Sequence, residues 1–267
     1  MKLLYYDKDI SGHHLEYVHH LYVGMASRTD SQYVFVLPEE FQAVKSKYEW
    51  PEASNICFDF LTQEELNAAA SDSILKTAWR HTKLIRRKVR KHSPDSIFFA
   101  SLIDFFPFVL FSLPSGVKIS GIVYQIYLYK WRRMGWLGKI KNACIFKMLS
   151  VGRSVENIYI LNDEAAAHRL NKIYATTIFK SLTDPFNEIA YQPNNLRKEL
   201  GLDSNFRIFL HFGGLTKRKG TIKLLEAISE IKPADRKGIA FVFAGRVYSD
   251  IHDEFYRLVN KLESTII

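Results

Sequence analysis

Cysteine is scarce in this sequence, with only Cys57 and Cys144 among 267 residues. The two form no spaced motif, so no disulfide framework is indicated and the usage fits a reducing cytosol. The opening stretch MKLLYYDKDISG also lacks a long apolar core after its lysine and a small-residue cleavage site. We therefore expect no signal peptide and predict a cytoplasmic protein.

Long uninterrupted apolar runs are missing as well. The stretch that comes nearest, IFFASLIDFFPFVLFSLPSGV at residues 97–117, is broken by Asp104, Pro107 and Pro114. A membrane-spanning helix needs about 20 predominantly apolar residues in succession. The pattern therefore favours a buried strand followed by a short helix.

Apolar residues and local positive charge are abundant. Hydrophobic residues make up 47% of the chain and aromatic residues 14%, enough to bury a substantial core in one or two domains. The formal net charge is +9. Residues 76–92 hold eight Lys or Arg and residues 130–147 hold six, with no acid in either segment. Two local patches therefore make the protein basic.

Strand-like and helix-like segments alternate along the first part of the chain. The segments that read as strands are residues 1–7, 33–38, 55–60, 96–101, 117–124 and 157–161. Helical spacing runs through residues 11–27, 71–91 and 164–174. This alternation predicts an α/β fold with a parallel sheet and crossover helices. We expect a complete doubly wound, Rossmann-like domain at 1–182, a linker at 183–205, and the first part of a second such domain at 206–267.

The stretch FLHFGGLTKRKGTIKLLEAI, residues 209–228, opens that second domain. Gly213 and Gly214 would let the backbone approach a ligand, and Arg218 and Lys219 would add positive charge at the start of a helix. The spacing matches neither the Walker A motif nor the GxGxxG fingerprint. A phosphate-binding loop and a plain basic turn are both consistent with these residues.

A second candidate loop follows the first strand. Its residues are Ser11, Gly12, His13 and His14, where backbone N–H groups suit an anion and the histidines could orient an acceptor hydroxyl or a phosphate. The alternative is that one histidine caps the helix and the other packs on it. With His19 and His20 the histidines do not have the spacing of a metal site, and we predict no bound metal.

The segment from the linker LRKELGLD through GGLTKRKG to TIKLLEAI resembles the nucleotide-sugar domain of GT-B glycosyltransferases, especially family 4. The loop SGHHLEY resembles their N-terminal glycine-rich loop more weakly. The resemblance implies that Lys219 contacts the donor diphosphate. Gly214 stands where the family usually has an arginine, so one diphosphate contact is either missing or must come from Arg218 or Lys217. The family's histidine after the fourth or fifth strand is also missing, since this strand ends at Tyr124.

The resemblance implies an activity and its substrates. The expected reaction is transfer of a hexose from a UDP- or GDP-sugar to a hydroxyl of a glycan or lipid-linked acceptor, in cell-surface polysaccharide or lipid-linked glycan synthesis. The resemblance implies anomeric retention, metal independence and no bound cofactor. Asp104 is a candidate base and could equally cap a helix. The family's paired glutamates would lie beyond Ile267, so we predict a chain truncated in its second domain, and whether it is active alone or an inactive fragment stays open at this point.

The two basic segments combine charge with tryptophan. Residues 75–89 place Leu75, Trp79, Thr82, Ile85 and Val89 on one helical face, with Lys88 among the charges outside it. The predicted membrane or acceptor patch comprises Trp79, Arg80, Lys83, Arg87, Trp131, Arg132, Arg133 and Trp136. Tryptophan beside Lys and Arg suits an anionic membrane, and we predict a peripheral location on its inner face.

Other interpretations of the basic patches remain open. The apolar helix faces could pack in the core with solvated charges outside. Nucleic acid is the least favoured partner, because no binding motif accompanies the charge. The alternative function is a non-enzymatic membrane- or nucleic-acid-binding protein on a degenerate sugar-nucleotide scaffold.

Overall fold

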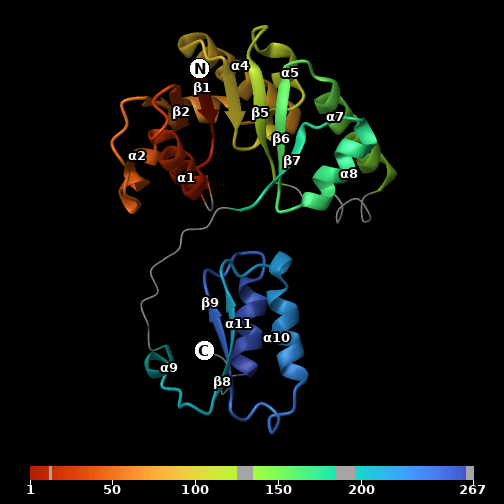
Figure 1. The fold of residues 1–267 in the computed structure, drawn as a ribbon. Helices are drawn as coiled ribbons and strands as arrows, with labels where there is room; N and C mark the ends of the chain where they lie inside the picture. Colours follow the sequence, from red (N-terminus) through yellow and green to blue (C-terminus); the bar gives the residue numbers. More distant parts are fainter. Residues whose placement is uncertain (12–13, 125–134, 185–195, 263–267) are drawn as a thin grey trace. The chain divides into compact units, whose positions relative to one another are not determined.

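The computed structural model describes residues 1–11, 14–124, 135–184 and 196–262. The chain forms two compact units, an N-terminal unit of Met1–Glu188 and a C-terminal unit of Ile189–Ile267 (Figure 1). Each unit has its own hydrophobic core. Of the predicted linker at 183–205, residues 185–195 lie outside the described residues.

A parallel sheet of seven strands forms the centre of the N-terminal unit, in the order β3-β2-β1-β4-β5-β6-β7. The strands are β1 (Lys2–Tyr6), β2 (Gln32–Pro38), β3 (Ile56–Leu61), β4 (Ser96–Phe99), β5 (Lys118–Val123), β6 (Val155–Leu161) and β7 (Phe179–Leu182). Apolar side chains alternate between the two faces, so that Leu4 and Tyr6 point to one core and Tyr5 to the other.

Helices cover both faces of this sheet. The longer ones are α1 (His14–Ala26), α3 (Gln63–Ala69), α4 (Ile74–His92), α5 (Phe108–Ser112), α7 (Trp136–Val151) and α8 (Glu164–Tyr174). Helix α1 and the short α2 (Phe41–Val44) pack on one face, and α4, α5, α7 and α8 pack on the other. The short 3-10 helices are η1 (Lys45–Lys47) and η2 (Leu102–Phe105). The predicted doubly wound α/β fold is confirmed.

The strand order reverses at β1, which lies between β2 and β4. The chain first builds outward through β2 and β3 and then crosses to the other side of β1. In open α/β sheets, ligands bind outside the carboxyl ends of the strands at such a reversal. The fold therefore points to the ends of β1 and β4 as a binding position.

The apolar stretch at residues 97–117 is a buried strand, a 3-10 turn and a short helix, as expected: β4, η2 and α5. Among the described residues no helix has the length and apolar character needed to cross a membrane.

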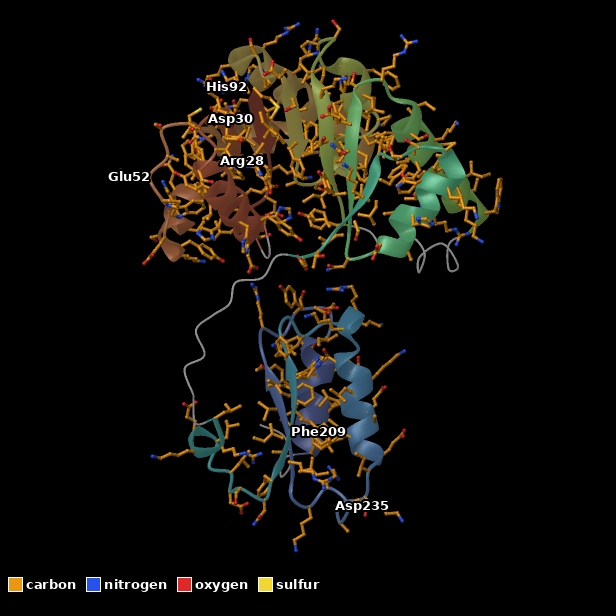
Figure 2. All side chains as sticks on the ribbon, in the orientation of Figure 1. Arg28, Asp30, Glu52, His92, Phe209 and Asp235 are labelled. Carbon is orange, nitrogen blue, oxygen red and sulfur yellow. The ribbon has the colours of Figure 1, made fainter. Side chains whose placement is uncertain are left out.

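The C-terminal unit contains two parallel strands, β8 (Arg207–Phe212) and β9 (Ile239–Ala244). Helices α10 (Thr221–Glu230) and α11 (His252–Lys261) pack against them around Leu225, Phe241 and Phe255. The short elements are α9 (Leu196–Glu199) and η3 (Lys217–Lys219). The side chains of Phe209, labelled in Figure 2, Leu210 and Phe212 on β8 are exposed.

Helix α4 corrects one detail of the sequence analysis. Lys88, expected among the outward charges, is only 6% exposed. Its Nζ lies 2.9 Å from Oδ1 of Asp59 and donates to the carbonyl of Phe60 at 2.7 Å. Asp59 lies on β3 and faces α4, and it also accepts from His92, labelled in Figure 2, at 2.7 Å. The ion pair is what permits a charged side chain to be buried on this face.

Candidate functional site

The carboxyl end of β1 carries a buried acid, Asp7, which is 2% exposed. Its carboxylate accepts three hydrogen bonds. The backbone N–H of Asp9 donates at 3.1 Å, the hydroxyl of Tyr5 at 3.1 Å, and Nδ1 of His14 lies at 2.8 Å. A carboxylate held by this many donors is fixed in orientation.

His14 is the first residue of α1 and points back toward the end of β1. Burial lowers the pKa of its imidazole, but the hydrogen bond and charge of Asp7 outweigh burial and leave the pKa raised. Its ring lies 5.6 Å from that of Tyr124, which follows β5. The Tyr124 hydroxyl is buried and has no hydrogen-bond partner in the described part of the chain. Three elements therefore meet beside His14.

Asp104, the predicted base, lies within η2 beyond β4 rather than at the strand end. Its Oδ2 is 3.0 Å from Nζ of Lys8. Lys8 follows Asp7 at the end of β1, whereas Asp104 follows β4, so the ion pair joins the two sides of the strand-order reversal. The predicted acid is thus at the expected edge of the sheet, but in an ion pair. His81 of α4 lies nearby, and burial followed by the charge of Lys8 lowers the pKa of its imidazole to about 4.

A cavity of about 560 Å³ opens beside the same loop. Lys8, Asp9 and Ser11 line one side, and Glu40 and Tyr48 belong to the other. Mixed charges and an aromatic ring suit a hydroxyl-rich ligand. Of the predicted loop residues, the structure therefore places Ser11 at a cavity and His14 at the strand-order reversal. Gly12 and His13 lie outside the described residues.

The other two histidines of this region have packing roles. The ring of His19 stacks on Tyr48 at 4.6 Å, and its Nε2 lies 2.9 Å from the carbonyl of Glu49. The ring of His20 lies 6.1 Å from that of His19.

In the C-terminal unit, the turn after β8 places Lys219 over the predicted glycines. Gly213 has φ of 92°, in the left-handed region that favours glycine. A Cβ at Gly213 would lie 2.8 Å from Nζ of Lys219, so the ammonium group folds back onto this turn. Thr216 accepts the backbone N–H of Lys219 at 3.3 Å and fixes the start of η3. The turn brings together Gly213 and Lys219, as predicted.

Positive charge gathers at the turn between β8 and α10. Lys217, Arg218 and Lys219 form η3, directly before the first turn of α10. Within the described part of the unit, no salt bridge involves these three side chains. Asp250, the nearby acid, instead accepts the backbone N–H of Lys217 at 3.1 Å. Unpaired cations beside a helix N-terminus favour an anion.

The sequence analysis missed Arg246 and Tyr248, which lie at the carboxyl end of the strands in the C-terminal unit. Arg246 follows β9, and its guanidinium lies 5.5 Å from the ring of Tyr248. A Cβ at Gly214 would be 3.0 Å from that ring, which gives a packing reason for glycine where the resemblance expects arginine. A Cβ at Gly245 would lie 2.0 Å from the carbonyl oxygen of Gly213. The sequence signal that could have identified Arg246 is the Gly245-Arg246 pair directly after the apolar strand β9.

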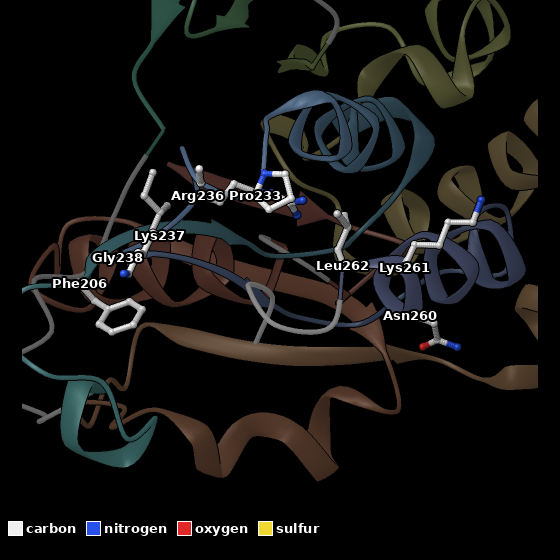
Figure 3. A pocket seen from close by; sticks show the side chains of 10 residues that line it. Phe206, Pro233, Arg236, Lys237, Gly238, Asn260, Lys261 and Leu262 are labelled. Carbon is white, nitrogen blue, oxygen red and sulfur yellow. The ribbon is translucent and has the colours of Figure 1, made fainter.

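A further concavity, of about 690 Å³, lies at the opposite end of these strands (Figure 3). Phe206, Gly238 and Leu262 are among its lining residues. It is at the amino ends of β8 and β9, whereas ligands of parallel α/β sheets bind at the carboxyl ends. We therefore place the candidate site at Gly213 and Lys219.

The residues of the predicted basic patch have two different roles in the structure. Arg80 donates to the carbonyl of Ala70 at 2.8 Å, and Arg87 pairs with Glu65, so both tie α4 to α3. Trp79 is 42% exposed, with the Nζ of Lys83 5.1 Å from its ring centroid. The predicted apolar face of α4 is buried from Thr82 onward, whereas Leu75 and Trp79 in the first turns of the helix are exposed to solvent.

Helix α7 presents a second apolar surface. Trp136, Leu137, Ile140 and Val151 are exposed along it, and Trp136 reaches 69%. Lys139, Lys141 and Lys147 are the charged residues of this helix, which has no acid. Trp131, Arg132 and Arg133 lie outside the described residues.

No protein-family model and no curated protein matches the sequence. The structure, in contrast, has the GT-B fold over the length that it spans, with a parallel sheet and covering helices in each unit. The chain spans about two thirds of the length of the solved structures that it matches.

Three solved structures illustrate this similarity. Anabaena HepE in complex with UDP and glucose has a TM-score of 0.62 at 14% identity, over 100% of this chain and 68% of its own. WaaG, a glycosyltransferase of lipopolysaccharide biosynthesis, has 0.62 at 14%, over 100% and 69%. A protein described as a UDP-N-acetylglucosamine 2-epimerase, from Listeria monocytogenes, has 0.57 at 11%, over 99% and 67%. At these identities the likeness shows the fold, and function rests on the sites.

Proposed function

We propose that this chain belongs to a glycosyltransferase that moves a sugar from a UDP- or GDP-sugar to an acceptor hydroxyl. The observation that carries the proposal is the turn at Gly213, where the ammonium of Lys219 lies over a glycine backbone before α10. A diphosphate needs a close backbone approach together with positive charge, and this turn offers both. The UDP bound to the similar HepE structure supports the same ligand class.

The chemistry at this turn is stabilisation of a leaving group. As the bond between the anomeric carbon and the diphosphate breaks, negative charge develops on the phosphate oxygens. Lys219, Arg218 and the backbone around Gly213 and Gly214 would hold that charge, and Arg246 adds a further cation at the end of β9. Fixed donors aimed at developing charge lower the barrier. The family 4 resemblance further implies that the anomeric configuration is retained and that the reaction needs no metal ion.

The acceptor would bind in the N-terminal unit. The cavity of about 560 Å³ beside Ser11 has the mixed polar lining that a sugar hydroxyl needs. We propose a glycan or lipid-linked acceptor, in polysaccharide or lipid-linked glycan synthesis, because exposed apolar and basic surfaces occur on the same unit.

Calorimetric titration with UDP and GDP tests the donor site. We expect binding of at least one diphosphate by the full chain, and weaker binding of the matching monophosphate. Lys219→Gln should raise Kd by about tenfold to a hundredfold, because one charge-assisted hydrogen bond is lost. Lys223→Gln removes an exposed charge from α10 and is the matched control.

Equal Kd values for the Lys219 and Lys223 variants would contradict the donor site. If diphosphate binds, assays with UDP-N-acetylglucosamine distinguish sugar transfer from the 2-epimerase activity for which the similar Listeria monocytogenes protein is named. Absence of any nucleotide binding would favour the alternative of a non-enzymatic binding protein.

We also propose that the N-terminal unit docks on an anionic membrane from the cytoplasmic side. Trp79 beside Lys83, and Trp136 with Leu137 on a helix whose charges are all basic, support this surface. Tryptophan settles at the lipid headgroups, and each nearby basic residue adds about 1 kcal/mol.

Co-sedimentation with vesicles tests this surface. We expect binding to vesicles that contain phosphatidylglycerol and little binding to phosphatidylcholine alone. Trp136→Ser should reduce the bound fraction, whereas Tyr256→Ser, which changes an exposed aromatic residue of the C-terminal unit, should not. Equal and negligible binding to both kinds of vesicle would contradict the membrane proposal.

A further inference from the structure

The cavity of about 560 Å³ at the carboxyl ends of β1 and β2 combines apolar and polar side chains. Its apolar lining comes from four separate elements of the N-terminal unit: Leu15 of α1, Pro38 of β2, Val44 of α2 and Leu66 of α3. The polar lining comes from the loop after β1 and from the segment around η1. A ligand of this cavity must therefore offer an apolar surface as well as polar groups.

The charged residues that line this cavity are balanced in sign. Lys8 and Lys47 are the cations, and Asp9 and Glu40 are the anions. Lys8 is in addition paired with Asp104 at 3.0 Å. The cavity therefore has no excess of positive charge with which to bind a phosphate, in contrast to the turn of the C-terminal unit. A neutral ligand suits it better.

Two of these charged side chains remain available to a ligand. Among the residues that the structure describes, no ion pair involves Glu40 or Lys47. Asp9, in contrast, is engaged locally, because its Oδ1 accepts the backbone N–H of Ser11 at 2.8 Å. A carboxylate accepts hydrogen bonds from hydroxyl groups and an ammonium donates to them. Glu40 and Lys47 together therefore suit a ligand that carries several hydroxyl groups.

The aromatic residue of the cavity is Tyr48, which follows η1 and is half-buried. The imidazole of His19 stacks on its ring, with the centroids 4.6 Å apart and the planes inclined by 23°. The backbone N–H of Tyr48 donates to the carbonyl of Lys45 at 3.3 Å. Because His19 covers one face of the ring, the opposite face is the one that a ligand in the cavity can contact.

His19 is itself held in place, although it does not line the cavity. Its Nε2 lies 2.9 Å from the carbonyl oxygen of Glu49. A carbonyl oxygen can only accept a hydrogen bond, so the neutral imidazole carries its proton on Nε2. The ring of Trp50 packs edge-on against the same imidazole at 5.1 Å. The orientation of Tyr48 is therefore set before any ligand arrives, which reduces the entropy lost on binding.

We infer that Tyr48 is the stacking surface of a subsite for a neutral pyranose, and that His19 is the residue that positions it. This inference rests on the proposed function, in which the cavity takes the acceptor, and it adds that the acceptor ends in a sugar ring. The C–H face of a pyranose packs on an aromatic ring because the ring face is slightly negative and the C–H bonds are slightly positive. The hydroxyl groups around the sugar would then reach Glu40 and Lys47.

Saturation-transfer NMR of the full chain with methyl β-glucoside, methyl β-galactoside and methyl α-mannoside tests the subsite. We expect at least one glycoside to bind, with the strongest saturation on the C–H protons of one ring face. Tyr48→Leu should abolish this preference for one face and raise Kd by about fivefold, because the aromatic contact is lost. Tyr48→Phe keeps the ring and should keep both properties. Phe111→Leu makes the same kind of change at an exposed aromatic residue of α5 and is the matched control.

Variants of His19 test the positioning role. His19→Ala should raise Kd for the same glycoside by about threefold, whereas His19→Phe restores a ring against Tyr48 and should recover the wild-type value. A loss of binding in Phe111→Leu as large as that in Tyr48→Leu would contradict the subsite.

Three results would overturn the inference: no binding of any of the three glycosides by the wild type, even saturation of both ring faces, or wild-type binding by Tyr48→Leu. The wild-type saturation pattern needs no variant, so the test does not depend on how well the variants fold. UDP titration of the same samples scores the proposed function separately. Binding of UDP without any glycoside would refute this subsite alone, and binding of a glycoside without UDP would refute the donor site alone.

Discussion

At the scale of single residues, His81 is a buried histidine whose burial outweighs the opposing charge of Asp104. It is 5% exposed, and its Nδ1 has no hydrogen-bond partner among the described residues. Burial is the main reason that its pKa falls to about 4, and the charge of Lys8 adds to the effect. The folded protein therefore keeps this imidazole neutral at a pH where the unfolded chain would protonate it.

This difference predicts an acid sensitivity of the N-terminal unit. The stability contributed by neutral His81 is fully present above the unfolded pKa near 6.5 and is lost as pH falls toward 4. From pH 7 to pH 4.5 we expect a loss of roughly 2–3 kcal/mol from this residue. In His81→Gln that part of the slope should disappear. Urea unfolding at both pH values measures it, and identical slopes in the two proteins would contradict the prediction.

At the scale of elements, an ion-pair cluster ties α4 to β3. Asp59 contacts Lys88 at 2.9 Å, His92 at 2.7 Å and Lys91 at 3.2 Å. Burial works against the charge of Asp59, but these three partners hold its pKa well below the usual range. Lys91 is exposed, whereas Lys88 is buried, so Lys88 is the lysine that would be left without solvent or a counter-ion if Asp59 were lost.

Asp59→Asn should therefore destabilise the N-terminal unit by about 3–5 kcal/mol, because it leaves Lys88 buried without a counter-ion. The double variant Asp59→Asn with Lys88→Met removes both charges and should recover at least half of this loss. Urea unfolding of the three proteins measures both effects. A double variant as unstable as the single one would show that the buried charge is not the cause.

At the scale of the whole molecule, the two units have separate cores, which predicts separable unfolding. All four tryptophans lie in the N-terminal unit, at positions 50, 79, 131 and 136, so fluorescence follows that unit alone. Leu225→Ala should lower the stability of the C-terminal unit by about 2–5 kcal/mol and leave the fluorescence transition unchanged. Ile85→Ala should shift the fluorescence transition by a similar amount. Circular dichroism, which reports both units, completes the comparison.

Much of the fold followed from local patterns. Helix α8 occurs at the predicted bounds, and most of the expected strands differ by a residue or two. Helix α7 and strand β7 were not predicted. The exposed apolar residues of α7 blur its helical periodicity, and β7 has only four residues. The glycine turn with Lys219 was predictable because all of its parts lie within a few residues of one another.

The polar partnerships could not be derived in the same way. Local periodicity encodes backbone conformation and the side of each element that is buried, so the order of strands and helices was accessible from the amino acids. Which polar groups meet depends on which strands become neighbours and in what register. Asp59 and Lys88 are brought together by packing of α4 on β3, and Arg246 reaches the Gly213 turn because β8 pairs with β9. The contact between Asp7 and His14 exists because the chain turns back at the end of β1.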